Sequence, residues 1–111
     1  MKRYKSVVCN DGFTMSVQAG PGLMSSRRFD DSTPLRTVEV GFPSEKEDLL
    51  MAYFPQDPQD LTETVYGWVP VRVVAAICLN HGGVVGGELP TEVWLSLIRG
   101  AIGRSMCQHF I

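Results

Sequence analysis

Residues 5–18, KSVVCNDGFTMSVQ, contain two runs of strand-forming residues separated by Asn-Asp-Gly at positions 10–12. The Asp-Gly pair favours a tight hairpin turn because both residues tolerate the positive φ angles that such turns need. In the second run Phe13, Met15 and Val17 alternate with polar residues, which predicts one buried face and one solvated face. This stretch therefore predicts a β-hairpin, and we expect the hairpin to lie on the outside of a sheet.

Two further strands are predicted after the hairpin. Residues 36–42 (RTVEVGF) alternate apolar and polar side chains and stop at Pro43, which cannot donate to a strand ladder. Residues 64–66 (TVY) form a short apolar run after an extended, proline-containing connection, and they predict a fourth strand. Residues 19–35 show neither helical nor strand periodicity. A loop of that length is uncommon in a compact domain and is usually either functional or mobile.

Helical signals begin at Ser44. Ser44 and Glu47 match the S-x-x-E capping box, which predicts a short helix through about Tyr53. Pro70 suits the first position of a second helix over VRVVAAICLN, which the glycines at 82 and 83 should end. Apolar residues surround nearly the whole circumference of this helix, so we expect it to be largely enclosed.

The last helix should follow a flexible glycine-rich bend at residues 84–87 and should be capped by Thr91. Its apolar residues fall on one stripe that should cover the sheet; they are Val93, Trp94, Leu97, Ile98, Ala101 and Ile102. We expect both tryptophans, Trp68 and Trp94, in the core. The order of the elements predicts a single α+β domain over residues 1–111, in which two main helices pack on a small antiparallel sheet of three to four strands.

Composition excludes several classes of function. The 12 acidic and 10 basic side chains give a formal charge of −2, so no global field attracts the chain to nucleic acid or to an anionic membrane. The three cysteines are irregularly spaced, which indicates a reducing compartment rather than a disulfide scaffold. No apolar run suits a signal peptide or a membrane span. We therefore expect a cytoplasmic protein.

Acidic residues concentrate in one segment, opposed there only by Lys46; they are Glu45, Glu47, Asp48, Asp57, Asp60 and Glu63. Such a run is usually a solvated face. The alternative is an acidic surface that meets a basic partner, and we retain Glu45, Glu47 and Asp48 as candidate binding residues.

A second candidate binding site lies in the long loop. Arg27 and Arg28 are followed by Phe29 and by the acidic pair Asp30 and Asp31. Guanidinium groups pair bidentately with phosphate or carboxylate, and an aromatic neighbour can stack on a base. The alternative is a solvated loop held by local Arg–Asp pairs. Two adjacent acids in a serine-rich loop form turns more often than catalytic sites.

Motifs for metal binding or catalysis are weak. Cys78-x-x-His81 and Cys107-x-His109 could in principle supply four zinc ligands, but a free cysteine in an apolar helix is usually a core residue. Cys9 or Cys107 could also pair with His81 or His109 as nucleophile and base, but such a pair is recognised by geometry, and neither cysteine stands in a nucleophile motif. We therefore expect no metal, no cofactor and no enzymatic activity.

Several stretches together, DGFTMSVQAG, TVEVGFPS, TVYGWVPV and NHGG, span most of residues 9–83. In these stretches the chain resembles a set of small uncharacterised proteins encoded by bacteriophages and prophages. The resemblance implies a phage gene product in a bacterial cytoplasm. Small phage proteins without catalytic motifs often block or decoy host defence, which is an analogy between classes of protein.

Three functional hypotheses follow. The first is an anti-CRISPR-like inhibitor that binds a host protein or ribonucleoprotein complex through the acidic segment or the 19–35 loop. The second is a nucleotide-binding sponge that sequesters a phosphorylated immune signal, with Arg27 and Arg28 as phosphate clamps. The third, a small enzyme, has the least support because no nucleophile, base and oxyanion donor can be assembled. A homodimer is compatible with each of them.

Overall fold

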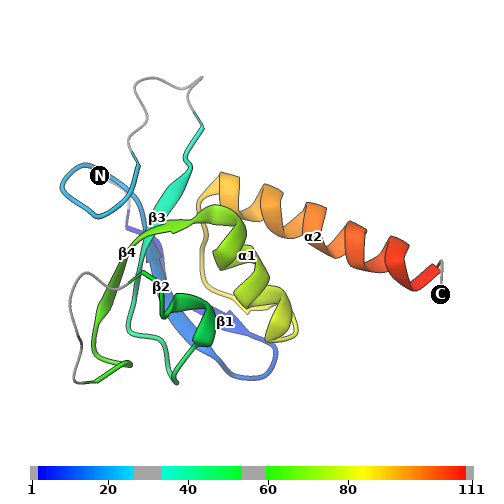
Figure 1. The fold of residues 1–111 in the computed structure, drawn as a ribbon, viewed down its shortest axis with the longest axis horizontal. Coiled ribbons are helices and arrows are strands. Elements are labelled where there is room, and N and C mark those ends of the chain that lie inside the picture. The colour runs from blue at the N-terminus through cyan, green and yellow to red at the C-terminus, as the bar shows by residue number, and fades with distance from the viewer. Residues whose placement is uncertain (1–2, 27–33, 54–59, 110–111) are drawn as a thin grey trace.

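The computed structural model describes residues 3–26, 34–53 and 60–109, with residues 103–109 described by their backbone alone. Within these residues the chain forms one antiparallel sheet, a short 3-10 helix and two α-helices (Figure 1). The elements are β1 (Val7–Cys9), β2 (Thr14–Gln18), β3 (Thr37–Gly41), η1 (Asp48–Leu50), β4 (Val65–Pro70), α1 (Val71–Asn80), β5 (Val84–Gly86) and α2 (Thr91–His109). The α+β class with two helices is confirmed, but the sheet has five strands in the order β4-β3-β2-β1-β5 rather than three or four.

The predicted hairpin forms, but it lies inside the sheet and not on its outside. β1 and β2 pair antiparallel, and the turn closes with a bond from the Cys9 amide to the Phe13 carbonyl at 2.8 Å. Gly12 has a φ of 95°, a value that glycine adopts without steric cost. β3 pairs with the free edge of β2, and β5 pairs with the free edge of β1. The hairpin expected at the edge is therefore central.

Residues 84–86 form edge strand β5 and not a flexible bend. The strand pairs with β1 through Val8 with Gly86 and Cys9 with Val84. It can form because Gly87, at φ 87°, lets the chain pass close to the backbone before β1: a Cβ at Gly87 would lie 2.0 Å from the Ser6 carbonyl oxygen. The glycines in this segment thus permit a close backbone approach.

β4 is longer than residues 64–66 and contains a bulge. Tyr66 pairs with Val40 and Val69 pairs with Val38, so Gly67 and Trp68 together oppose one residue of β3. The bulge places Trp68 at a φ of 55° with 56% of its surface exposed. The expectation that Trp68 belongs to the core is therefore wrong.

The capping box at Ser44 does not form. Ser44 instead continues the pairing beside β2, since its Oγ accepts a hydrogen bond from the Thr14 amide at 3.0 Å and its amide donates to the Thr14 carbonyl at 2.8 Å. A serine side chain that bonds elsewhere cannot cap a helix. The predicted helix through Tyr53 is reduced to η1, which Glu47 caps by accepting from the Leu49 amide.

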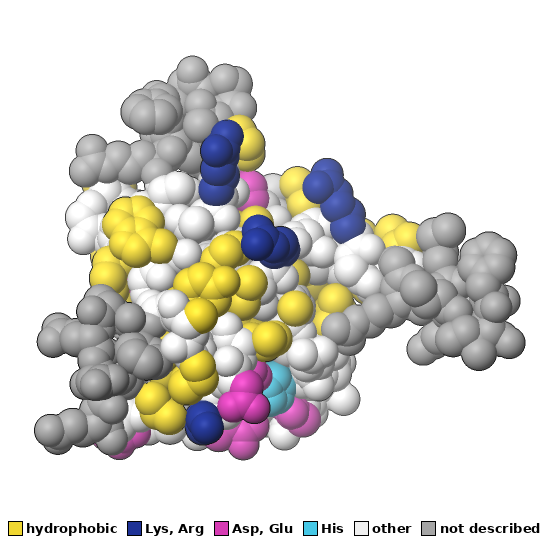
Figure 2. Space-filling view, in the orientation of Figure 1, with side chains coloured by type: hydrophobic (Ala, Val, Ile, Leu, Met, Phe, Trp, Pro, Cys, Tyr) yellow, Lys and Arg dark blue, Asp and Glu magenta, His cyan; other side chains and the backbone are white. Residues whose placement is uncertain are grey.

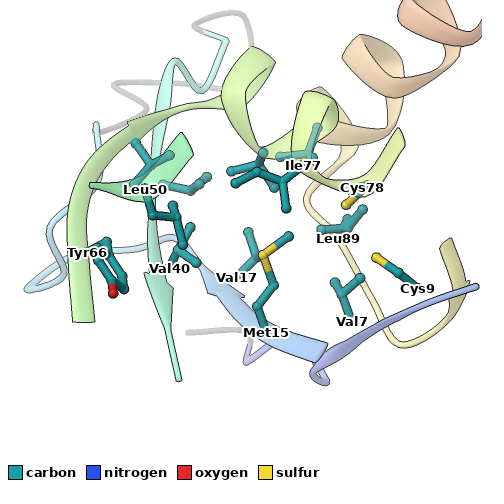
Figure 3. Close-up of a cluster of buried hydrophobic side chains, with 14 of the residues drawn as sticks. Val7, Cys9, Met15, Val17, Val40, Leu50, Tyr66, Ile77, Cys78 and Leu89 are labelled. Carbon is teal, nitrogen blue, oxygen red and sulfur yellow. The ribbon is translucent and has the colours of Figure 1, made fainter. Parts of the chain in front are cut away.

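The core lies between the sheet and α1 (Figure 3). Val7, Met15 and Val17 point from β1 and β2 toward Ile77 and Cys78 of α1. Each of these side chains is at most 1% exposed, and a well-packed apolar core of this kind is the main source of folding free energy. The prediction that α1 is largely enclosed is confirmed, since among its residues only Arg72 and Asn80 are exposed.

The prediction that the last helix is buried along one apolar stripe is confirmed only in part. α2 packs against α1 through Val93, which is fully buried, and through the partly buried Trp94 and Leu97. Ile98 and Ile102 are 51% and 55% exposed. Gly100, between them, still lies against Leu79 of α1, and the last turns of α2 extend past the end of α1 (Figure 1). The stripe therefore covers the core in the first turns alone. No helix within the described residues is long and apolar enough to cross a bilayer.

Candidate functional site

A groove of about 620 Å³ opens where the start of β3, the first turn of α1 and the middle of α2 meet. We call it the arginine groove, because three of its lining residues are arginines. It is lined by Pro34, Leu35, Arg36, Val71, Arg72, Glu92, Leu95, Ser96 and Arg99. Dark blue basic side chains gather around apolar surface over this part of the molecule (Figure 2).

Three separate elements position the arginines. Arg36 directly precedes β3, and its carbonyl accepts a hydrogen bond from the Val71 amide at 3.0 Å, which ties the start of α1 to β3. Arg72 is in the first turn of α1. Arg99 lies on α2 one turn beyond Leu95, and residues four apart share a helix face. The fold thus collects three guanidinium groups that are far apart in sequence.

The charge of the arginine groove is positive. All three arginines are exposed, and no ion pair within the described parts of the chain engages them. The one acid in the lining, Glu92, accepts a hydrogen bond from the Leu35 amide at 2.9 Å. α1 begins beside the groove with Pro70 as an N-cap that makes no side-chain bond, and its first turn has no acid. Guanidinium groups and the positive end of a helix dipole both favour an anion.

A second polar cluster surrounds His81, directly after α1. Its Nδ1 lies 2.6 Å from Asp11 Oδ2, and its Nε2 lies 2.8 Å from Glu47 Oε1. The ring stacks on Phe13 with centroids 4.0 Å apart and planes 14° apart. We call Asp11, Glu47 and His81 the acid–histidine cluster. Figure 2 shows its cyan and magenta side chains on the face that also carries the arginine groove.

The acid–histidine cluster favours protonated His81. Burial alone would lower the pKa of His81, but its hydrogen bonds and charge interactions with Asp11 and Glu47 outweigh burial and raise that pKa above its ordinary value. The pKa of Asp11 is lowered, first by the hydrogen bond from the Phe13 amide and then by the one from His81. A histidinium between two carboxylates, at the negative end of a helix, is a favourable arrangement.

The acid–histidine cluster has the geometry of a structural link between segments. Both ring nitrogens of His81 are engaged by carboxylates from two different loops, which leaves neither nitrogen to act as a base or as a metal ligand. Within the described residues no group of histidine, cysteine and acidic side chains could hold a metal ion. The cluster joins the hairpin turn, the loop before η1 and the end of α1.

The sequence-predicted site residues separate into three groups. Arg27, Arg28, Phe29, Asp30 and Asp31 lie outside the described residues. Glu45 and Asp48 are exposed, and Asp48 Oδ1 lies 3.7 Å from Lys46 Nζ. The side chain of Glu47 is only 11% exposed and binds His81, so it does not belong to an accessible acidic surface. Asp57 is outside the described residues, whereas Asp60 and Glu63 are exposed.

Two cysteines of the conceivable zinc or nucleophile sites are core residues. Cys9 and Cys78 are 1% and 0% exposed and are both free thiols. Burial raises the pKa of Cys9 and raises that of Cys78 to about 12. Because the thiolate is the nucleophile and the metal ligand, these two positions suit packing. The side chains of Cys107 and His109 lie outside the described residues.

Sequence reasoning missed Arg36, Arg72 and Arg99. Each stands alone in its segment, so no local motif indicated a basic site. The one available signal was an arginine in the first turn of an otherwise apolar helix. Comparison of the chain with protein-family models, with curated proteins and with solved structures gave no match.

Proposed function

We propose that this protein is a non-catalytic binding protein that holds a small phosphorylated ligand, of the nucleotide class, in the arginine groove. The observation that carries the proposal is the convergence of Arg36, Arg72 and Arg99 on one groove. Phosphate is the anion that guanidinium forks bind bidentately. The nucleotide class agrees with the second sequence hypothesis, but the clamping residues are different from those proposed there.

The walls of the arginine groove support an organic ligand over a bare anion. Leu35, Val71 and Leu95 supply apolar surface between the charged groups. A volume of about 620 Å³ lies within the range of small-molecule sites, roughly 300–1,000 Å³, and such sites combine apolar walls with a few polar groups. A base or a similar flat group on the apolar wall, with its phosphates toward the arginines, fits both features.

Binding without catalysis is supported by the state of the reactive groups described above. The thiols of Cys9 and Cys78 are buried with raised pKa values. His81 has both nitrogens bound to carboxylates. A catalytic site needs a nucleophile and a base that can reach substrate, and these residues offer neither.

The test is a thermal melt with a panel of linear and cyclic nucleotides. A ligand at about 100 times its dissociation constant adds about 2.7 kcal/mol to the free energy of unfolding. Arg72→Gln and Arg99→Gln should each weaken binding about tenfold or more, since a charge-assisted hydrogen bond contributes about 1.5–3 kcal/mol.

Lys46→Gln is the matched control, because it also removes one exposed positive charge but does not line the arginine groove. Its binding should equal that of the wild type. If no nucleotide in the panel shifts the melt, or if Lys46→Gln weakens binding as much as Arg72→Gln, the proposal is wrong.

The inhibitor hypothesis stays as a second candidate because of one observation. Glu45 and Asp48 are exposed in the segment that also carries Leu49, which is 40% exposed, and the largely buried side chain of Glu47 bonds this segment to His81. An exposed apolar residue near exposed acids suits a basic protein partner. The inhibitor hypothesis is tested by a pull-down of binding proteins from a bacterial host lysate, once with the wild-type chain and once with the double variant Glu45→Lys, Asp48→Lys.

The charge-reversed variant should lose a partner that the wild type retains, and the loss should be greater at low salt. Glu47 is left unchanged so that the acid–histidine cluster persists. An identical set of captured proteins for both chains would remove the acidic surface from consideration.

A further inference from the structure

The face of the sheet opposite α1 is a second surface with binding features. Within the described residues no helix covers it, since α2 packs beside α1 (Figure 1). Two adjoining hollows of about 300 Å³ and about 210 Å³ lie on it and share Arg3, Ser16, Gln18 and Phe42. We call them together the sheet-face hollow. Its remaining lining residues are Tyr4, Lys5, Ser6, Leu23, Glu39, Gly41 and Val65.

Phe42 stands exposed at this surface on a hydrogen-bonded backbone. Phe42 is 57% exposed, although phenylalanine is among the residues most often buried. Its φ of 52° is rare for a residue with a side chain. The Phe42 amide donates to the Thr64 carbonyl at 3.1 Å, and Ser44 is bonded to Thr14. Strained backbone of this kind clusters at ligand-binding sites. Trp68 has the same conformation and a similar exposure, but of the two only Phe42 lines the hollow.

The basic N-terminal segment lies beside Phe42. Buried Gln18 clamps Tyr4: Gln18 Oε1 accepts from the Tyr4 amide at 2.9 Å, and Gln18 Nε2 donates to the Tyr4 carbonyl at 2.6 Å. Lys5 is fixed by its backbone to Glu88, with bonds of 3.0 and 3.1 Å. These bonds place Arg3 and Lys5 at the sheet-face hollow. The basic residues near the start of the chain are thus held at a defined place on the sheet. None of the three sequence-based hypotheses assigns them a role.

The lining charge is positive. Arg3 and Lys5 are both exposed, and the acid among the lining residues is Glu39. Oε2 of Glu39 accepts a hydrogen bond from the Met24 amide at 3.0 Å, so this carboxylate also serves the packing of the neighbouring loop. A ligand for the hollow should therefore combine negative charge with a flat apolar surface.

We propose that the sheet-face hollow binds single-stranded nucleic acid, with a base stacked on Phe42 and backbone phosphates at Arg3 and Lys5. Aromatic side chains on an open sheet with basic neighbours are a general solution for single strands. The hollow crosses four neighbouring segments, from residues 3–6 through β2 and β3 to β4. At about 4.8 Å between strands it spans about 14 Å, which favours a strand of several nucleotides over a free nucleotide.

The test is fluorescence anisotropy of a labelled, ~10-nucleotide single strand, a length within the usual site sizes for such surfaces, titrated with the full chain. Phe42→Leu should weaken binding about tenfold, because it removes the stacking surface but retains an apolar side chain. Trp68→Leu is the matched control, since Trp68 is also exposed and also has a positive φ but does not line the hollow. It should leave affinity unchanged within about twofold, a margin well below the stacking loss.

Arg3→Gln provides a second variant without risk to the fold, because Arg3 is exposed. It should weaken binding and should reduce the slope of log affinity against log salt by about one. Unlabelled duplex and mononucleotides serve as competitors, and both should compete poorly.

The proposal is overturned if the wild type does not bind the strand at low salt, if duplex or mononucleotide competes equally, or if Trp68→Leu loses as much affinity as Phe42→Leu. Arg72→Gln should not affect strand binding, because Arg72 lies in the arginine groove. The proposals for the two sites can therefore fail separately.

Discussion

His81 shows how one side chain can join distant segments. Its two ring nitrogens form hydrogen bonds with Asp11 of the hairpin turn and with Glu47 of the loop before η1, and its ring stacks on Phe13. The sequence predicted only that a histidine lies at the glycine-marked end of a helix. The two carboxylate partners are distant in sequence, so only the folded chain could show them.

We expect the stability of the wild type to fall as the pH rises above the unfolded pKa of histidine, about 6.5. The pKa of His81 is raised in the folded state, so its contribution is fully present below the unfolded pKa of about 6.5 and is lost as the pH rises through the folded pKa. Asp11 acts oppositely: its pKa is lowered, so its contribution is present above about pH 3.9 and is lost in acid. Urea unfolding of the wild type and His81→Asn at several pH values measures the slopes.

His81→Asn should flatten the decline with rising pH. His109→Asn is the control, since it removes the other histidine, and it should keep the wild-type slope. An unchanged slope in His81→Asn would contradict the assignment of this pH dependence to the acid–histidine cluster.

Gly87 and Gly83 offer a matched pair for backbone approach. Both have positive φ, 87° and 92°, but a Cβ at Gly83 meets nothing within 4 Å, whereas one at Gly87 would lie 2.0 Å from the Ser6 carbonyl oxygen. Gly83→Ala should cost about 1–2 kcal/mol for its backbone conformation. Gly87→Ala should cost about 3 kcal/mol or more because β5 must also move away from β1. Chemical denaturation compares the two, and equal losses would argue against close packing of β5.

At the scale of elements, local sequence patterns predicted the positions of strands and helices well. They predicted poorly which segments those elements pack against. The Asp-Gly turn predicted the hairpin, because turn geometry depends on adjacent residues alone. The capping box failed because Ser44 bonds to Thr14, which is distant in sequence. β5 was missed because a glycine-rich run has no strand periodicity, and its ladder exists only once β1 is beside it.

The two α-helices should respond differently to the same substitution. Ile77 of α1 is fully buried and Ile102 of α2 is 55% exposed. Ile77→Ala should lower the free energy of unfolding by about 2–5 kcal/mol. Ile102→Ala should change it by less than about 0.5 kcal/mol, because alanine is also a good helix former. Comparable losses in urea unfolding would show that the end of α2 is packed in solution.

For the whole molecule, a small negative net charge conceals two local positive surfaces. Arg36, Arg72 and Arg99 meet on the helical side, and Arg3 and Lys5 lie on the opposite face of the sheet. Net charge governs long-range attraction, whereas local clusters govern contact. The exclusion of a global nucleic-acid field from composition therefore does not contradict the proposed local sites.

The buried thiols should report unfolding of the whole domain. In a Cys107→Ser background, Cys9 and Cys78 should resist a thiol-specific reagent under native conditions, because both are buried and burial raises both pKa values. Both should react at once in denaturant. Labelling rates at increasing urea should follow the fraction unfolded, and rapid native labelling of either thiol would show that the β1–α1 layer opens locally.

The sequence by itself determined the features that depend on neighbouring residues: the turn at 10–12, the alternating strands β2 and β3, the apolar helix α1 and its glycine-marked end. Only the tertiary structure decided the central place of the hairpin, the strand at 84–86, the exposure of Trp68 and Ile102, and the meeting of Arg36, Arg72 and Arg99. The physical reason is the separation in sequence over which each interaction acts. Turn and helix preferences act over a few residues, whereas strand pairing, burial and shared grooves join segments whose separation in sequence carries no local signal.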